Sequence, residues 1–429
     1  MKKLLFILDT FHPEYASTGQ LMTELCQHLQ YDFDITVIVG IPQYGVDEDP
    51  KYAKGTFFFE KFQNINLVRV RTPKVKKASK LSRLMYLVGH FVNALRATFR
   101  VAKPDLIYVI SQPPIVGGML GRLTKLFRGG ALLYNIQDFN PEQIEAVGYS
   151  KMKPLISVAK WLDNRTIFRA DKVIVVGRDM YKTVHDRHHK HDMDKVSVIN
   201  NWINEGSVRK CSGNGVSCAC GRIAEYNELY NPDKKFTIMY SGNVGLYYDL
   251  ENIIKVIGKF DSYEDMQFVF VGGGTKKAEL EAYCQEHNLS NVKFFDYVPK
   301  EYVQCSLNTA DVHLVTNQKG IKGVSVPSKI YGVLAVAKPV FGILEDASEA
   351  HMIIEESGCG KSVEPQDYEG IEALIQWFYD HRHESASMGD QGRAYLDDHL
   401  LMIDSLEKYK CEIAKLVGAE GLDLCEGCE

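Results

Sequence analysis

Residues 323–331 read GVSVPSKIY, a loop that turns into a helix directly after the short apolar strand predicted at 312–315. A strand, a glycine-containing loop and a helix in this order form one βα unit. Free N–H groups at the helix start, the Ser328 hydroxyl and the Lys329 ammonium all suit a diphosphate. Pro327 and Ser328 are equally ordinary signals for a helix start. The stretch therefore predicts a nucleotide-linked substrate. The alternative is that Pro327 and Ser328 only begin a helix and bind no ligand.

The same alternation of short apolar runs and helix-length segments continues along the chain. Six apolar runs read as the buried parallel strands of a first domain, and four more belong to a second. They are 4–8, 35–39, 67–70, 106–110, 132–136 and 172–176, then 236–240, 268–271, 292–295 and 312–315. The pattern predicts an α/β protein of two doubly wound, Rossmann-like domains facing a cleft, where ligands bind beyond the carboxyl ends of the strands.

The length of 429 residues exceeds what one hydrophobic core usually supports, which also favours two domains. We predict a first domain over 1–204, a linker or insertion over 205–235, and a second domain over 236–400. The remaining residues, 401–429, form a helix and tail that could pack back on the first domain. We find no internal repeat beyond this two-fold recurrence.

The composition is that of an ordinary soluble globular protein, with 45% hydrophobic residues, 24% charged residues and a net charge of -5. This balance gives no global attraction to nucleic acid, so we expect no nucleic-acid partner. The opening residues MKKLLFILD read as a buried strand rather than a signal peptide, and no apolar run is long enough to span a bilayer. We expect a cytoplasmic protein.

Ten cysteines are too sparse for a disulfide scaffold, so we expect reduced thiols. Cys211, Cys218 and Cys220 lie in one loop-like segment, and Cys425 and Cys428 close the chain. A zinc site between the two groups is conceivable, but the spacing lacks paired CxxC knuckles. We therefore expect no metal.

Further loops that follow predicted strands carry glycine or carboxylate. Residues 240–245 read YSGNVG and residues 271–274 read VGGG, where glycine allows close approach of a phosphate or of another backbone. Neither matches a GxGxxG or Walker loop, which argues against a dinucleotide or P-loop site. Residues 137–142 read QDFNPE, in which Asp138 and Glu142 could bind hydroxyls or accept a proton. Alternatively, Glu142 only stabilises a helix N-terminus.

The order and spacing of these motifs resemble glycosyltransferase family 4, whose members have the GT-B architecture. The matching stretches are 13–29, 137–142, 198–203, 240–245, 269–274 and 324–331, followed by 337–340. More narrowly, the chain resembles a bacterial branch that includes N-acetylfucosamine transferases of surface-polysaccharide pathways such as O-antigen and capsule synthesis. The resemblance implies sugar transfer from a nucleotide sugar with retention of configuration, without a metal ion or cofactor. A UDP-sugar donor and a lipid-linked saccharide acceptor are the implied substrates.

The resemblance also implies roles for individual residues. Lys329, helped by Ser328 and the backbone at Pro327, would neutralise the leaving diphosphate. Asp138 would orient the acceptor hydroxyl, with Glu142 beside it. The implied catalytic residues are Lys329, Asp138 and Asn243. The implied donor-binding residues are Gly19, Gly242, Gly272, Gly273, Tyr297, Val298, Pro327, Ser328 and Lys329, with the base held by the backbone around Tyr297 and Val298.

The chain departs from the family pattern at two places. A carboxylate usually follows the phosphate loop to hold the ribose, but Gly332 stands here. Many relatives also have an Arg and a Lys where this chain has Asn243 and Tyr248. These departures keep two alternatives open: a GT-B nucleotide-sugar 2-epimerase, and an inactive scaffold that binds a nucleotide sugar.

The segment 74–103 contains eight Lys or Arg residues and no acidic residue, interleaved with apolar side chains. Such a basic amphipathic helix can lie on anionic lipid, which would place the protein on the inner face of the plasma membrane. Alternatively, the apolar stripe belongs to the core and the charges form an ordinary solvated face.

Overall fold

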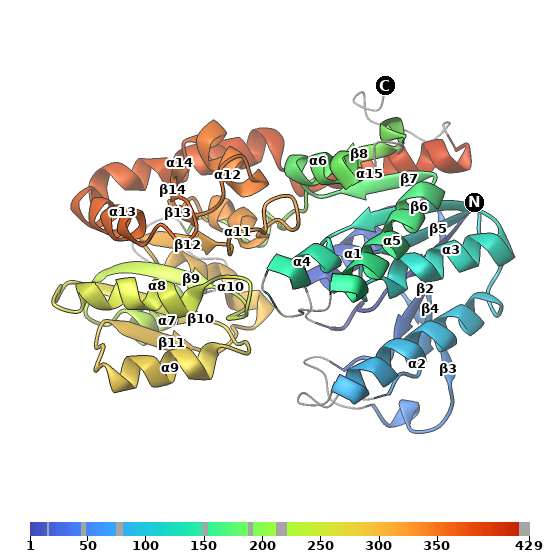
Figure 1. Ribbon diagram of the computed structural model, residues 1–429, viewed down its shortest axis with the longest axis horizontal. Coiled ribbons are helices and arrows are strands. Elements are labelled where there is room, and N and C mark those ends of the chain that lie inside the picture. The colour runs from blue at the N-terminus through green and yellow to red at the C-terminus, as the bar shows by residue number, and fades with distance from the viewer. Residues whose placement is uncertain are drawn as a thin grey trace. The chain divides into compact units, whose positions relative to one another are not determined.

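The computed structural model describes residues 1–14, 17–43, 49–73, 80–146, 148, 153–187, 192–211 and 221–419 (Figure 1). The chain divides into two compact units, each with its own parallel sheet. The first comprises Met1–Glu142, Ser150–Asn201 and Ile403–Glu429, and the second comprises Gln143–Tyr149 and Trp202–Met402. The predicted boundary near residue 204 thus lies at residue 201, and the segment predicted as a linker belongs to the second unit.

The first unit is built on an eight-stranded sheet of order β3-β4-β2-β1-β5-β6-β7-β8. The strands are β1 Lys3–Ile7, β2 Asp34–Gly40, β3 Phe57–Phe62, β4 Ile65–Val70, β5 Leu106–Ile110, β6 Ala131–Ile136, β7 Lys172–Val175 and β8 Val196–Val198. The six predicted strands are present. Two edge strands were not predicted, because β3 carries charged residues and runs antiparallel to β4, whereas β8 has three residues.

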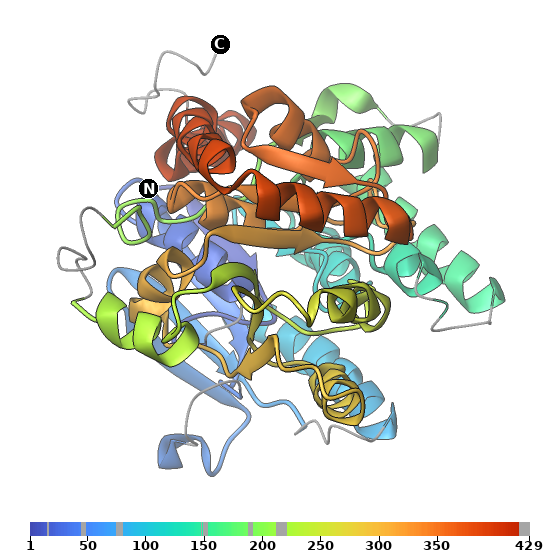
Figure 2. The same ribbon diagram turned by 90° about the vertical axis from the view of Figure 1, so that its left-hand side faces the viewer.

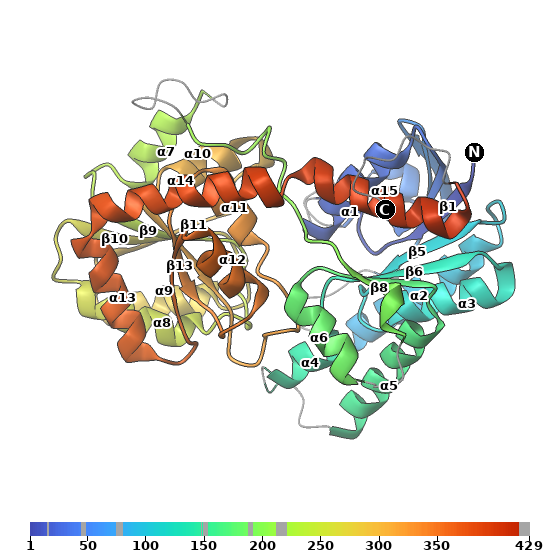
Figure 3. The same ribbon diagram turned by 90° about the horizontal axis from the view of Figure 1, so that it is seen from above.

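Helices cover both faces of this sheet. They are α1 Ser17–Leu29, α2 Lys80–Thr98, α3 Val116–Arg128, α4 Asn140–Ala146, α5 Lys153–Arg169, α6 Arg178–Arg187 and α15 Met402–Val417. On one face α2, α3 and α5 lie side by side, and on the other α1 lies with α15 (Figure 3). The terminal helix α15 is fixed by the buried Tyr409, whose hydroxyl is bonded to Asn135, and by an ion pair of 2.8 Å between Lys410 and Asp32.

The second unit is built on a six-stranded, fully parallel sheet of order β11-β10-β9-β12-β13-β14 (Figure 2). Its strands are β9 Phe236–Ser241, β10 Met266–Val271, β11 Val292–Phe295, β12 Val312–Thr316, β13 Val340–Ile343 and β14 Gly360–Val363. Its helices are α7 Ile223–Tyr230, α8 Leu250–Ile257, α9 Lys277–Glu286, α10 Val303–Asn308, α11 Lys329–Ala335, α12 Glu349–Ser357, α13 Tyr368–Asp380 and α14 Arg382–His399. The strands β13 and β14 and the helix α7 were not predicted.

The strand order of the second unit reverses between β9 and β12. Successive strands lead from β9 through β10 to β11 in one direction, whereas β12 pairs with the other side of β9 and leads to β14. In open α/β sheets, ligands bind outside the carboxyl ends of the strands at such a switch point. The loops after β9, β10 and β12 are therefore where a ligand is expected.

The described cysteines correct one expectation. Cys26, Cys211, Cys284 and Cys359 are free thiols, as predicted, but Cys305 and Cys411 are disulfide-bonded. Cysteine spacing along the sequence does not reveal which sulfur atoms the fold brings together, so the sequence could not predict these bonds.

Four of the cysteines weighed above as zinc ligands lie outside the described residues, as does the basic stretch 74–79; they are Cys218, Cys220, Cys425 and Cys428. Within the described ranges, no three His, Cys, Asp or Glu side chains gather in a way that would hold a metal ion. None of the helices described has the length and apolarity needed to cross a membrane.

Candidate functional site

Two glycine loops touch at the switch point of the second unit. Gly242 directly follows β9 with φ 145°, and Gly272 directly follows β10 with φ 139°. A Cβ atom on Gly272 would lie 2.0 Å from the carbonyl oxygen of Gly242, a distance that no side chain tolerates. Two backbone hydrogen bonds of 2.9 Å, from Gly242 to Val271 and from Val244 to Gly273, hold the loops together. Glycine is thus required here by the close approach of two backbones.

Lys329 extends from the start of α11 over the first of these loops. Its Nζ lies 3.9 Å from the ring centroid of Tyr240 and 4.2 Å from that of Tyr248. A Cβ placed on Gly242 would lie 3.8 Å from this Nζ. Although the residue as a whole is partly exposed, its Nζ is buried and has no hydrogen-bond partner among the described residues. A buried amine without a partner is costly, so the position calls for an anion.

Burial lowers the pKa of the Lys329 amine from its ordinary 10.5 to about 7. At a pH between these two pKa values, the Lys329 amine is protonated in the unfolded chain and neutral in the folded chain. The contribution of this group to stability is therefore greatest above pH 10.5 and falls as the pH drops towards 7. A diphosphate beside the amine would reverse the shift, because an opposite charge favours the protonated form.

The sequence analysis gave no role to Tyr240, and it named Tyr248 only as the residue that stands where many relatives have a basic side chain. Tyr240 is buried and donates its hydroxyl hydrogen to the carbonyl of Asn243 at 2.6 Å, which fixes the turn of the glycine loop. The backbone carbonyl of Tyr248 accepts a 3.3 Å hydrogen bond from Thr316 at the end of β12. The two rings form the aromatic floor beneath the amine of Lys329. The available signal was a tyrosine near the end of β9, Tyr240, and a second one, Tyr248, in the loop between β9 and α8.

The helix start itself is less substantial than the sequence suggested. The helix α11 has only seven residues, and Ser328 at its N-cap makes no side-chain hydrogen bond to it. Pro327 is buried and Ser328 is exposed. The dipole of so short a helix is a small contribution, and the side chain of Lys329 is the stronger reason to expect a phosphate. The roles of Pro327 and Ser328 stay predictions.

Tyr297 and Asn243 lie beside the same loops. Tyr297 follows β11, is 63% exposed and donates its hydroxyl hydrogen to the carbonyl of Gly273 at 3.1 Å. The neighbouring Val298 packs partly buried against a small cluster. Asn243 is exposed, and its side-chain oxygen lies 2.7 Å from where a Cβ on Gly274 would stand. The second unit therefore brings together most of the predicted donor-binding residues.

The remaining predicted site residues belong to the first unit. Asp138 follows β6, accepts a 3.1 Å hydrogen bond from Gln112, and its backbone N–H donates to Ser111 Oγ at 3.2 Å. It is partly exposed at the carboxyl edge of the sheet, and its acceptor-binding role stays a prediction. Gly19 lies in α1, where a Cβ would approach the hydroxyl of Thr10 to 2.9 Å. The structure thus gives Gly19 a packing reason for being glycine.

Glu142 has partners within the first unit. Its carboxylate accepts hydrogen bonds from Arg187 on α6, one of them 3.0 Å long, and Lys160 lies 3.7 Å away. The same guanidinium also binds Asp163 at 2.5 Å. These contacts join α4, α5 and α6, which favours a structural role for Glu142. An acceptor-binding role stays a prediction.

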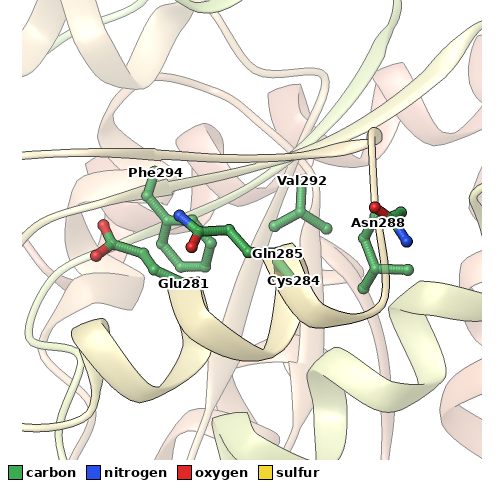
Figure 4. A pocket seen from close by; sticks show the side chains of 7 residues that line it. Glu281, Cys284, Gln285, Asn288, Val292 and Phe294 are labelled. Carbon is green, nitrogen blue, oxygen red and sulfur yellow. The ribbon is translucent and has the colours of Figure 1, made fainter.

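A surface pocket elsewhere in the second unit does not suit a nucleotide. It lies between α9 and β11 and is lined by Glu281, Cys284, Gln285, Asn288, Leu289, Val292 and Phe294 (Figure 4). Glu281 is its charged group and would repel a diphosphate. Burial raises the pKa of the Cys284 thiol to about 11, which keeps it protonated and unreactive. We therefore place the candidate site at the glycine loops.

Two family models match successive parts of the chain. Residues 18–206 match the model described as Glycosyltransferase Family 4, and residues 222–395 match Glycosyl transferases group 1. The first match contains Asp138 and Glu142, and the second contains the glycine loops and Lys329.

Curated relatives and solved structures agree with these matches. The probable glycosyltransferase WbjE of Pseudomonas aeruginosa is 25% identical over 97% of this chain and 99% of its own. The putative colanic acid biosynthesis glycosyl transferase WcaI of Escherichia coli is 26% identical over 88% of this chain and 91% of its own. Anabaena HepE, solved with UDP and glucose, superimposes with a TM-score of 0.70 at 13% identity, covering 97% of this chain and all of that one. The two-domain Rossmann-like fold predicted from the sequence is thereby confirmed.

Proposed function

We propose that the chain is a glycosyltransferase of polysaccharide biosynthesis that transfers a sugar from a UDP-sugar to a lipid-linked saccharide with retention of configuration, which the two family matches and the curated relatives support. The sugar we propose is an N-acetylated hexose, on the resemblance to N-acetylfucosamine transferases. HepE, which shares the fold, was solved with UDP and glucose, which supports a uridine donor. The product belongs to a surface polysaccharide such as O-antigen or capsule.

The buried amine of Lys329 carries this proposal. It has no partner among the described residues and stands over a glycine loop at the switch point. When a nucleotide sugar breaks, negative charge develops on the leaving diphosphate, and a fixed cation lowers the energy of that transition state. A lysine in this position supplies the positive charge that a divalent ion supplies in other enzymes, so we propose a metal-independent reaction.

The other side chains of the site have matching roles in the proposal. The glycine loops let backbone N–H groups approach the phosphates closely. The backbone around Tyr297 and Val298 would hold the base, and the exposed ring of Tyr297 beside Gly273 could pack against it. Asp138 would orient the acceptor hydroxyl, since its carboxylate is partly exposed and fixed by Gln112.

The proposed function is tested by acceptor-dependent release of nucleoside diphosphate. The purified protein is incubated with UDP-N-acetylhexosamines and a lipid extract that contains polyprenyl-diphosphate saccharides, and the new glycolipid is identified by mass spectrometry. We expect turnover only with both substrates, and unchanged turnover when EDTA is present. Turnover without acceptor would indicate an epimerase instead. Loss of turnover in EDTA that a divalent ion restores would contradict the metal-free mechanism.

Gly332 offers a gain-of-function test. It is buried in α11, and an added Cβ would lie 3.4 Å from Leu307, an ordinary contact. A Gly332→Glu change would restore the carboxylate that resembled proteins place near the ribose. We expect UDP to bind about tenfold more tightly, since a hydrogen bond to a charged group is worth roughly 1.5–3 kcal/mol. Calorimetry measures the change.

The matched control for this substitution is Gly332→Gln, which has the same size without the charge. Affinities of both variants equal to that of the unchanged chain would show that no ribose hydroxyl lies within reach, because the Gln carbonyl also accepts a hydrogen bond. Weaker binding by the Glu variant alone would show that the new carboxylate pairs with Lys329, one turn away, and competes with the phosphates.

A further inference from the structure

Exposed apolar side chains gather on one face of the first unit. Of the eighteen large hydrophobic residues exposed in the described chain, twelve lie on or directly after α2, α3 and α5. They are Leu81, Leu84, Met85, Val88, Val92, Phe99, Leu126, Phe127, Leu155, Val158, Trp161 and Phe168. Scattered single residues of this kind are normal, but a concentration on three neighbouring helices marks an interaction site.

The apolar residues follow helical spacing on the outer side of each long helix. On α2 they lie between Leu81 and Val92, each three or four residues from one on the next turn, and Leu81 is 65% exposed. The inner side of the same helix carries the buried Ala94 and Ala97. On α5 the outer side carries Trp161, which is 55% exposed. The alternative in which the apolar stripe of α2 belongs to the core is therefore wrong for these residues.

The three helices form one continuous surface, which we call the α2–α3–α5 face. The helix α3 contacts both α2 and α5 (Figure 3). A Cβ on Gly118 of α3 would come within 2.9 Å of Thr166 on α5, so the glycine lets these helices approach closely. Across the other junction, the rings of Phe99 and Phe127 are 6.2 Å apart between centroids. The apolar residues of neighbouring helices thus belong to a single surface.

This face is also strongly basic. The helices α2, α3 and α5 contain ten Lys or Arg residues and one acidic residue, Asp163. Asp163 is only 5% exposed and is bound by Tyr134 and Arg187, so it adds no negative charge to the surface. The guanidinium of Arg165 lies 4.9 Å over the ring of Trp161. Lys125 is paired with Asp171, and Lys160 lies 3.7 Å from Glu142, so these two lysines add little net charge. The basic residues still outnumber the carboxylates, which is a local concentration of positive charge in a chain of net charge -5.

We propose that the α2–α3–α5 face docks on an anionic membrane, with its apolar side chains in the boundary between headgroups and acyl chains. Arginine and lysine would then meet lipid phosphates, and Trp161 would lie at the depth that tryptophan prefers. The basic segment predicted at 74–103 is thus only part of the surface, which α3 and α5 extend. This inference rests on the proposed function, because a lipid-linked acceptor lies in a membrane.

The charge of the face selects this partner over two others. A second copy of the chain would bring the same basic face against the first, and like charges would repel. Nucleic acid would meet the basic side chains but would give exposed leucine, valine and methionine no apolar partner. An anionic bilayer satisfies both kinds of side chain.

The test is binding of the full chain to vesicles, with neither donor nor acceptor present. Vesicles contain phosphatidylcholine with or without phosphatidylglycerol, and binding is measured by flotation and by tryptophan emission. We expect binding to the anionic vesicles, weakened by salt, with a blue shift from Trp161. Trp202 is buried and Trp377 belongs to the second unit, so Trp161 dominates the change.

The decisive variant is Leu84→Gln with Leu155→Gln, which removes one exposed leucine from α2 and one from α5. Its matched control is Phe59→Gln with Leu229→Gln, two residues exposed on β3 and α7. We expect the first variant to bind vesicles at least tenfold more weakly than the unchanged chain, and the control to bind them as the unchanged chain does. The proposal would be overturned if the two variants bound vesicles equally, or if the unchanged chain did not bind them. It would also be overturned if the unchanged chain formed a dimer that the first variant disrupts. UDP binding, measured separately, shows whether the donor site is intact in either case.

Discussion

Lys329→Met is expected to lower sugar transfer by a factor of about 10² or more, as loss of a preorganised charge-stabilising group does elsewhere. Methionine has nearly the length of lysine and preserves the packing over Tyr240 and Tyr248. At pH 7 the variant should be at least as stable as the unchanged chain, because burial of the amine disfavours its charged form. Initial rates at saturating donor, together with thermal unfolding, measure both effects.

Lys322 provides the matched control for this experiment. It precedes Lys329 in the loop after β12, but it is exposed, and its backbone N–H is bonded to Glu345 at 2.8 Å. Lys322→Met should keep transfer within a few fold of the unchanged rate, since a solvated charge contributes little. Near-normal transfer by the Lys329 variant would remove this residue from the mechanism. A large loss in both variants would show that the loop acts through its overall charge.

Gly272→Ala is expected to disrupt the donor site and to destabilise the second unit. The new methyl group would meet the Gly242 carbonyl oxygen at 2.0 Å, and φ at this position is 139°. Relief would require breaking the hydrogen bond from Gly272 to the carbonyl of Phe295, which is 3.0 Å long. Backbone strain and overpacking together should cost about 3 kcal/mol, which lowers the melting temperature of a unit of this size by about 10 °C.

The neighbouring residue is the control. At Gly273 an added Cβ would meet, at 3.1 Å, the ring of Tyr297, which is exposed and can move. The melting temperature of Gly273→Ala should therefore lie within a few degrees of that of the unchanged chain. Differential scanning calorimetry compares the two variants, and UDP titration shows whether the site is retained. Normal stability and binding of the Gly272 variant would mean that the two loops do not touch in solution.

Much of the fold could be predicted from the sequence because its central strands are apolar and regularly spaced. Most of the unpredicted strands lack this signal: β14 reads GKSV and β8 has three residues, whereas β13 reads VFGI, is buried and was missed although it is apolar. The antiparallel β3 mixes phenylalanine with charged residues, as edge strands do. The helix α7 was also not predicted, because it lies in a polar segment whose composition is typical of a linker.

The candidate site was predictable only as separate motifs. Sequence reasoning selected Lys329 and the glycine loops, but the placement of the amine over two tyrosine rings depends on contacts between distant segments. For the same reason, it could not show that Arg187, 45 residues away, binds the carboxylate of Glu142. Periodicity likewise left two orientations for the apolar stripe of α2, and only the burial of the opposite side decides between them.

The most direct test of the central claim, that a nucleoside diphosphate meets the amine of Lys329, is a calorimetric titration with UDP at about pH 8 in two buffers of different ionisation enthalpy. Because the free amine has a pKa of about 7 and a phosphate favours its charged form, UDP should bind with uptake of about one proton. Lys329→Met should bind weakly and without this uptake. The same titration is carried out with GDP and with the N-acetylhexosamine conjugates of UDP and GDP. Absence of binding by every nucleotide, or binding with the same proton balance in both proteins, would contradict the account.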